Sequence, residues 1–287
     1  MGSPIAGRVV LITGAARGIG EHTARHAVAR GARVALVGLE ADRLDTLARE
    51  LHAVSFHCDV TDQAALDAAV RGTLEAYGRI DAVVANAGVA NRGTVAVGDI
   101  EALVRTVQVN LVGVMRTASA TVQSLIATRG YFLAISSAAA FTALPGMAAY
   151  CASKAGVEQF CNAFRLEVTH LGVRVGSAHP SWIDTDLVRD VAADVSTFED
   201  SLRGAPGPLG RILTVERCAE MLVEGIERRR RRVYVPRSLA LVQALRTVTL
   251  SPLADKVIGR TASTSVPRME AEAKALGRSF GEHTAEK

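Results

Sequence analysis

The feature that most constrains the fold is a regular alternation between short β-branched runs and longer segments of helical periodicity, from the N-terminus to about residue 235. Runs such as Val9-Val10-Leu11-Ile12 are apolar on both faces, which is typical of parallel strands covered by helices on each side. The sequence therefore predicts one doubly wound α/β domain with about seven parallel strands. The expected strands are 8–13, 33–37, 54–57, 80–85, 131–136, 173–178 and 232–235, and the expected helices are 18–30, 41–51, 62–77, 99–128, 149–170 and 214–229.

Two segments fall outside the alternation. Residues 186–212 show little periodicity and end in the breaker-rich run Gly204-Ala205-Pro206-Gly207-Pro208, so we expect a loop or lid after the sixth strand. Residues 237–287 form a basic C-terminal extension, for which we predict a partly helical structure with a disordered end. The main domain is accordingly expected to cover residues 1–236.

Charge is unevenly distributed along the chain. The net charge is +4, yet the residues from Ile226 to Lys287 hold 13 basic and 6 acidic side chains, which leaves 20 and 23 for the first 225. The body is therefore slightly acidic and lacks basic stretches interleaved with aromatic residues, so we expect no nucleic-acid binding. The run from Arg228 to Arg232 fits a solvated helix end. Together with the apolar residues of 239–250, it also fits a peripheral element on an anionic membrane.

The four cysteines show no CxxC pair and no metal-ligand spacing, and no signal peptide precedes the first strand. No apolar run reaches the length of a membrane span. We therefore expect reduced thiols, no metal site and a cytoplasmic location. The 49% hydrophobic content excludes intrinsic disorder.

A glycine-rich turn follows the first strand directly and opens a helix. It reads Thr13-Gly14-Ala15-Ala16-Arg17-Gly18-Ile19-Gly20. Glycines allow the backbone to turn tightly and to approach a pyrophosphate closely, and the unpaired amides of the helix N-terminus attract the phosphates. In this position the turn predicts a dinucleotide site in a Rossmann-type domain.

Six motifs in order show that residues 7–235 resemble the classical short-chain dehydrogenase/reductase family. The motifs are Thr13-Gly14-x-x-x-Gly18-x-Gly20, Cys58-Asp59-Val60-Thr61, Asn86-Ala87-Gly88, Val109-Asn110, Ser136-Ser137 and Tyr150-x-x-x-Lys154. The chain departs from the family after the sixth strand, where Pro180-Ser181-Trp182 replaces the common Pro-Gly. The resemblance implies a nicotinamide cofactor held by Gly14, Arg17, Gly18, Ile19, Gly20, Gly38, Asp59, Val60, Asn86, Ala87, Gly88, Tyr150, Lys154, Pro180, Ile183 and Thr185.

The expected catalytic residues are Tyr150, Lys154, Ser137 and Asn110. Tyr150 and Lys154 are four residues apart and share one helix face, so the ammonium can favour the phenolate and hold the cofactor's ribose. Lys154 is also the only lysine among the first 255 residues of an arginine-rich chain, which suggests a need for a compact ammonium. Ser137 can hydrogen-bond the substrate oxygen, and by resemblance Asn110 holds a water that relays the proton.

The type of nicotinamide cofactor depends on the end of the second strand. Gly38 stands where an acid would select NAD, and Arg17 stands where relatives that prefer NADP often keep a base. Leu39 and Glu40 argue in the other direction. We expect NADP to be favoured, with NAD as the alternative.

The expected function is an NAD(P)-dependent oxidoreductase that interconverts a secondary alcohol and a ketone. Apolar residues near the reacting centre, Ala139, Leu144, Met147 and Trp182, predict an apolar substrate. The alternative is a catalytically silent dinucleotide-binding sensor or scaffold. The resemblance also implies a homodimer or homotetramer built on the helices near 99–128 and 149–170.

Overall fold

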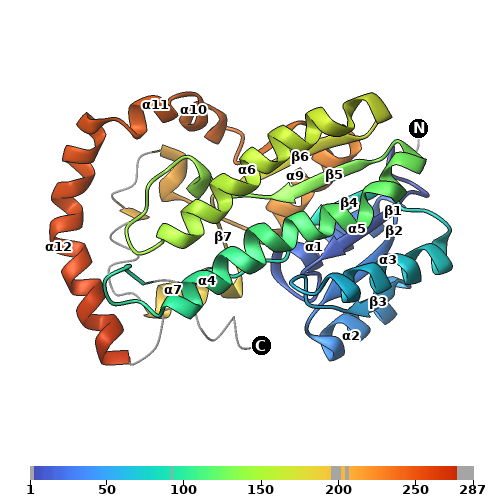
Figure 1. Cartoon of the computed structure of the whole chain (residues 1–287), viewed down its shortest axis with the longest axis horizontal. Helices are drawn as coiled ribbons and strands as arrows, with labels where there is room; N and C mark the ends of the chain where they lie inside the picture. The colour runs from blue at the N-terminus through green and yellow to red at the C-terminus, as the bar shows by residue number, and fades with distance from the viewer. Residues whose placement is uncertain (1–2, 92, 195–201, 204–206, 277–287) are drawn as a thin grey trace.

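The computed structural model describes residues 3–91, 93–194, 202–203 and 207–276. Its main sheet has seven parallel strands in the order β3-β2-β1-β4-β5-β6-β9 (Figure 1). The order reverses between β1 and β4, and in such sheets ligands bind at this point, outside the carboxyl ends of the strands. The strands are β1 (Val9–Thr13), β2 (Arg33–Gly38), β3 (Val54–His57), β4 (Ala82–Ala85), β5 (Tyr131–Ile135), β6 (Arg174–Pro180) and β9 (Arg232–Val235).

Helices cover both faces of the sheet, as the two-sided apolar strands predict. Val10 and Ile12 of β1 face one apolar cluster, and Leu11 between them faces the other. The first cluster contains α1 (Gly18–Ala29), α2 (Ala41–Leu51) and α9 (Val215–Glu227). The second contains α3 (Gln63–Tyr77), α5 (Gly113–Thr128) and α6 (Ala148–Val168). The doubly wound Rossmann-type fold is confirmed.

The helix expected over 99–128 is interrupted. It consists of α4 (Ile100–Val107), a π-helical turn at Gln108–Val112, and then α5. The wider turn is closed by the amide of Gly113, which donates to the carbonyl of Gln108. Periodicity cannot reveal such a turn, because apolar positions continue across it. Single π-turns of this kind are often found at functional sites.

The segment 186–212 is more regular than its sequence pattern predicts. Helix α7 (Asp186–Asp194) begins at its first residue, and β8 (Ile212–Leu213) pairs in parallel with β7 (Trp182–Ile183). Strands of two residues are too short to leave a periodic signal. The breaker-rich run expected to end the lid lies largely outside the described residues.

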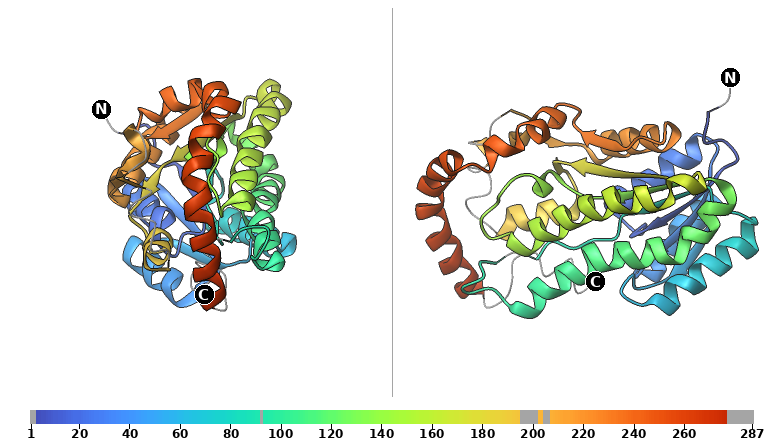
Figure 2. Two further views of the ribbon diagram at one scale, coloured as in Figure 1. Left: turned by 90° about the vertical axis from the view of Figure 1, so that its left-hand side faces the viewer. Right: turned by 45° about the horizontal axis from the view of Figure 1, so that its top comes forward.

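The C-terminal extension is helical from Leu239 onward. It contains α10 (Leu239–Ala244), α11 (Arg246–Thr249) and the long α12 (Pro252–Leu276). Helix α12 runs across one end of the molecule, as the left view of Figure 2 shows. The expected disordered end is thus helical as far as Leu276, and residues 277–287 lie outside the described part. None of the described helices is both long and apolar enough to cross a membrane.

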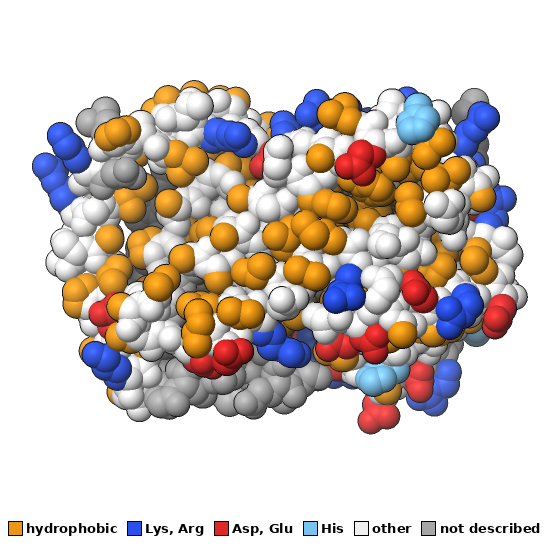
Figure 3. All heavy atoms as spheres, viewed as in Figure 1, with side chains coloured by type: hydrophobic (Ala, Val, Ile, Leu, Met, Phe, Trp, Pro, Cys, Tyr) orange, Lys and Arg blue, Asp and Glu red, His pale blue; other side chains and the backbone are white. Residues whose placement is uncertain are grey.

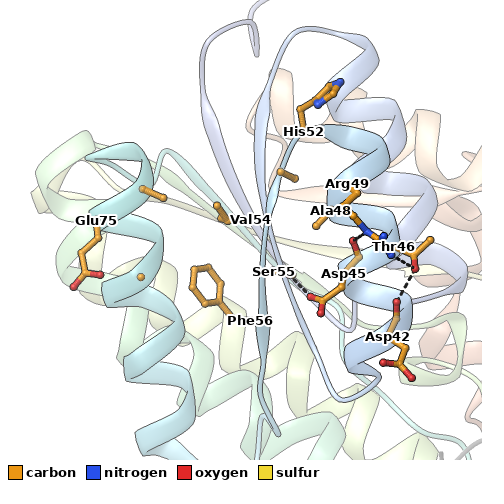
Figure 4. Close-up of a pocket in the computed structure, with 13 residues that line it drawn as sticks. Asp42, Asp45, Thr46, Ala48, Arg49, His52, Val54, Ser55, Phe56 and Glu75 are labelled. Atoms are coloured by element: carbon orange, nitrogen blue, oxygen red, sulfur yellow. Dashed lines mark hydrogen bonds between the residues drawn. The ribbon is translucent and has the colours of Figure 1, made fainter.

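An open groove of about 1350 Å³ lies between α2 and α3 over the edge strand β3 (Figure 4). Its lining mixes charged and apolar side chains, and Asp45 accepts a hydrogen bond from Ser55 across it. None of the residues expected to bind cofactor or substrate lines this groove. The site expected from the sequence is instead at the carboxyl ends of β1, β4, β5 and β6.

Candidate active site

The glycine-rich turn after β1 is packed too tightly for side chains. Gly14 has φ +62°, and a Cβ on it would lie 2.7 Å from the Cα of Ala87. A Cβ on Gly20 would overlap the carbonyl oxygen of Gly14. The turn therefore exposes backbone at the N-terminus of α1, as a pyrophosphate site requires.

Asn86 braces this turn from the end of β4. Its Nδ2 donates to the carbonyl oxygens of Thr13 and Gly14, both at 3.0 Å. In return, Thr13 Oγ1 accepts from the amides of Asn86 and Ala87 at 3.0 and 3.1 Å. These hydrogen bonds hold together the two loops that follow β1 and β4, where the strand order reverses.

The π-turn places Asn110 beneath the same loop. Asn110 is fully buried, and its Oδ1 accepts from the Val89 amide at 2.8 Å. Its Nδ2 donates to the Val89 carbonyl at 2.9 Å and to Ser153 Oγ at 3.2 Å. The side chain therefore joins the loop after β4 to α6 and uses both of its amide hydrogens.

Lys154 lies in the centre of the site, buried between α6 and β5. Its Nζ donates to the Ile135 carbonyl at 2.9 Å and lies 5.5 Å from the centre of the Tyr150 ring. Burial lowers the pKa of Lys154 to about 8, because the ammonium loses solvation there. A Cβ on Gly88 would lie 3.5 Å from this Nζ, so Gly88 keeps the space beside it open.

Ser137 stands at the end of β5, next to the end of β6. Its Oγ accepts from the Ala139 amide at 3.2 Å and makes a long 3.5 Å contact with the Pro180 carbonyl. The hydroxyl is half-buried, as is Tyr150. Four sequence-predicted residues, Asn110, Ser137, Tyr150 and Lys154, are therefore brought together from the π-turn, β5 and α6.

The segment after β6 returns to the glycine-rich turn. Ile183 is buried in β7, and Thr185 Cγ2 lies 3.5 Å from the position of a Cβ on Gly18. On the opposite side, Val60 packs against Gly113, and Asp59 accepts from the Thr61 amide at 2.8 Å. The residues expected to hold the two ends of the cofactor thus flank the turn.

Arg17 forms an ion pair that the sequence did not reveal. Its Nε donates to Glu40 Oε2 at 2.6 Å, and its Nη2 contacts the other carboxylate oxygen. Asp186 lies 3.9 Å away. Gly38, two residues before Glu40, has room for a Cβ, which would stand 3.5 Å from Leu44 and 3.7 Å from the Ala15 amide.

The four expected pocket residues lie at the same ends of the strands. Ala139 and Met147 are buried, and Leu144 and Trp182 are half-buried. Trp182 packs against a small cluster of Val188 and Met269, and sequence reasoning missed the part played by Met269 of α12 because it is distant in the chain.

A buried polar network behind the site was also missed. Glu158, four residues after Lys154 on α6, accepts from Arg232 at 2.8 Å and from Gln243 at 2.9 Å. Next to it, His179 contacts Ser177 Oγ at 2.9 Å, and burial lowers the pKa of His179 to about 4. The spacing Tyr150, Lys154, Glu158 is the sequence signal that could have found it.

The run from Arg228 to Arg232 is therefore not a simple solvated helix end. Arg232 binds buried Glu158, and Arg228 and Arg230 pair with Glu224 at 3.4 and 3.1 Å. Arg229 donates to the Arg129 carbonyl at 2.7 Å. Glu158 and Glu224 thus offset part of this charge, and Arg228, Arg229 and Arg231 remain exposed. Among the described residues, no three His, Cys, Asp or Glu side chains lie where they could hold a metal ion.

Comparison with known proteins gives consistent matches. The family model described as short chain dehydrogenase matches residues 8–196. The chain is 34% identical over 227 residues to glycine betaine reductase ATRR of Emericella nidulans, a match that covers 77% of this chain but only 18% of that protein. It is 33% identical over 230 residues to trans-4-hydroxycyclohexanecarboxylate dehydrogenase of Sinomonas cyclohexanicum, covering 76% of this chain and 85% of the relative.

Among solved structures, 3-ketoacyl-(acyl-carrier-protein) reductase from Brucella melitensis complexed with NADH superposes with a TM-score of 0.72 at 26% identity. The match covers 80% of this chain and 97% of that chain. The seven-stranded parallel sheet with helices on both faces agrees with this match along most of the chain. The chain thus belongs to the short-chain dehydrogenase family, whose members are NAD(P)-binding oxidoreductases.

Proposed function

We propose that this protein interconverts a secondary alcohol and a ketone on an apolar substrate, with Tyr150 as the general acid and base. The observation that carries the proposal is the position of buried Lys154, which shares a helix face with Tyr150 and bonds the last residue of β5, two residues before Ser137. Burying a lysine ammonium lowers the stability of the fold, because the charge loses solvation. Here the buried ammonium lies next to the Tyr150 phenol, whose ionised form it can stabilise, and perturbed groups of this kind are typical of functional sites.

In the direction of reduction, a bound nicotinamide supplies the hydride to the carbonyl carbon. Tyr150 donates its phenolic proton to the carbonyl oxygen, and Ser137 donates a hydrogen bond to the same oxygen as negative charge develops there. The Lys154 ammonium stabilises the resulting phenolate. In the reverse direction, the phenolate accepts the proton of the alcohol.

Asn110 belongs to the path that returns the proton to Tyr150. The Asn110 side chain joins the loop that follows β4 to helix α6, and so fixes the distance between that loop and the helix around Lys154. We propose that Asn110 holds the water that links Lys154 to solvent.

The lining of the pocket supports an apolar ring as substrate. Ala139, Leu144, Met147 and Trp182 offer alkyl and aromatic surface near Ser137. The Sinomonas relative is named for a substrate with a secondary alcohol on a six-membered ring. We therefore expect cyclohexanones and the corresponding alcohols to be accepted.

The test follows nicotinamide absorbance with the purified full chain and a panel of cyclic and open-chain ketones and alcohols. Turnover of a cyclic ketone supports the proposal. If the chain binds NADPH or NADH but turns over none of the panel, the sensor or scaffold alternative is correct instead.

We propose that NADP is preferred over NAD but that Glu40 limits the preference. The Glu40 carboxylate forms an ion pair with the Arg17 guanidinium and would repel a 2′-phosphate near the end of β2. Glu40→Gln should raise the ratio of kcat/KM with NADPH to that with NADH by about tenfold. Asp42→Asn, an exposed carboxylate in the first turn of α2, is the control and should leave the ratio unchanged. A fall in the ratio for Glu40→Gln would contradict this assignment.

We propose that the chain forms a homodimer or homotetramer through α4, α5 and α6. Apolar side chains gather over these helices on the face shown in Figure 3. The large apolar residues Val104 of α4, Met115 of α5 and Leu166 of α6 are exposed. Analytical ultracentrifugation decides the point, since a monomer at micromolar concentration would exclude it.

A cytoplasmic location with peripheral membrane contact through α10 and α11 is also part of the proposal. Leu241, Leu245, Val248 and Leu250 are all exposed there. We expect the chain to float with phosphatidylcholine vesicles that contain phosphatidylserine, and the double variant Leu245→Glu/Val248→Glu to float far less. Val95→Glu, at another exposed apolar position, is the control. Equal flotation of the double variant and the wild type would contradict the proposed membrane contact.

A further inference from the structure

Helix α12 closes over the end of the sheet where the active site lies. In the left view of Figure 2 it crosses in front of the body from top to bottom. Its second half contacts the body through Met269 and Glu270. Those contacts involve three loops, which follow β4, β5 and β6. Substrates of doubly wound folds enter at these same loops.

The contact with the loop after β5 is the closest. The Sδ of Met269 lies 2.5 Å from where a Cβ on Gly146 would stand. Gly146 has φ +74° and lies between Ser137 and Tyr150 in the chain. A side chain at position 146 would be strained by this φ and would displace the Met269 thioether.

The other two loops meet the same part of α12. On the segment after β6, Val188 is buried together with Met269 of α12, and Trp182 packs against this pair. Thr94 Oγ1, in the loop after β4, donates to Glu270 Oε1 at 2.7 Å. The Gly93 amide also donates to the Gly146 carbonyl at 3.0 Å, which ties two of the three loops together under the helix.

We infer that α12 is the outer wall of the substrate pocket and that Met269 limits the size of the substrate. The inference rests on the proposed function, since it concerns the ketone or alcohol that Tyr150 and Ser137 would hold. Trp182, an expected wall of that pocket, packs against the buried cluster that Met269 forms with Val188. A compact ring then fits beneath the helix, whereas a substituent directed away from the reacting carbon meets the thioether.

The test compares cyclohexanone with 4-phenylcyclohexanone, which present the same reacting group and differ only in bulk. Met269→Ala should raise the ratio of kcat/KM for the bulky ketone to that for the compact one by about tenfold. Met269→Trp should lower the same ratio. Because the two variants are expected to shift the ratio in opposite directions, a general loss of folding cannot imitate the result.

Lys274→Ala is the matched control, because Lys274 lies on the same half of α12 but is exposed. It should leave the ratio within about twofold of the wild type. If the wild type reduces cyclohexanone and neither Met269 variant changes the ratio, the inference is wrong and the proposed function stands. If the wild type reduces neither ketone nor any other member of the panel, both are wrong.

Discussion

Tyr150→Phe should lower kcat by about 10³-fold while the affinity for the nicotinamide cofactor stays close to that of the wild type. The substitution removes only the phenolic hydroxyl, so the ring and its contact with Lys154 remain. The hydride could still be delivered, but no group would be placed to give the carbonyl oxygen its proton. Steady-state turnover of cyclohexanone and fluorescence titration of the cofactor measure the two quantities separately.

Tyr77→Phe makes the same chemical change away from the site. The Tyr77 hydroxyl donates to the Val34 carbonyl at 3.1 Å and accepts from the Val54 amide at 3.2 Å. Losing these bonds should lower the Tm slightly and leave kcat unchanged. If Tyr150→Phe retains more than about a tenth of the wild-type kcat, Tyr150 is not the general acid.

Lys154→Met should lower kcat by a factor similar to that of Tyr150→Phe. It should also change how the stability of the protein depends on pH. Burial lowers the pKa of Lys154 in the folded protein to about 8, from the ordinary value of 10.5. Between these two values the unfolded chain keeps a proton that the folded chain has released. The stability of the wild type therefore gains from Lys154 as pH rises through this window.

Below pH 8, Lys154 is charged in both states, and the fold bears the full cost of burying an ammonium. Methionine has no such titration. We therefore expect the Tm of Lys154→Met minus that of the wild type, both free of cofactor, to fall by several degrees between pH 8 and pH 10. Lys256→Met, at an exposed lysine, should show no such trend. A difference that stays flat or rises with pH would contradict the burial argument.

Much of the fold could be predicted because its signals are local. Strands β3 and β9 and helix α2 begin and end where the periodicity indicates. The central strands β1 and β5 are buried at every position, and parallel strands of this kind need continuous apolar runs. The glycine-rich turn was recognisable because backbone sterics act within a few residues. The pair Tyr150 and Lys154 was recognisable because one helical turn fixes their relation.

The parts that could not be predicted depend on residues far apart in the chain. Thr94 and Glu270 are separated by 176 positions, and Arg232 and Glu158 by 74. Neither pair can be recognised from the periodicity of the sequence. The ion pair of Arg17 with Glu40 is closer in sequence, at 23 positions, but it depends on how the ends of β1 and β2 turn toward each other.

The C-terminal extension shows the same limit most clearly. Its polar composition after Thr261 predicted a disordered end, because an isolated segment of that kind lacks enough apolar surface to fold. In the structure, single contacts such as those of Met269 and Glu270 hold it against three loops.

The sequence by itself determined the strands of the sheet and predicted the glycine-rich turn and the residues Ser137, Tyr150 and Lys154 of the site, because each depends on neighbours within one or two turns of chain. Only the tertiary structure decided what surrounds them: which charge meets Arg17, what lies behind Lys154, and which helix covers the pocket. These relations arise from the packing of distant segments, whose contacts no local pattern encodes.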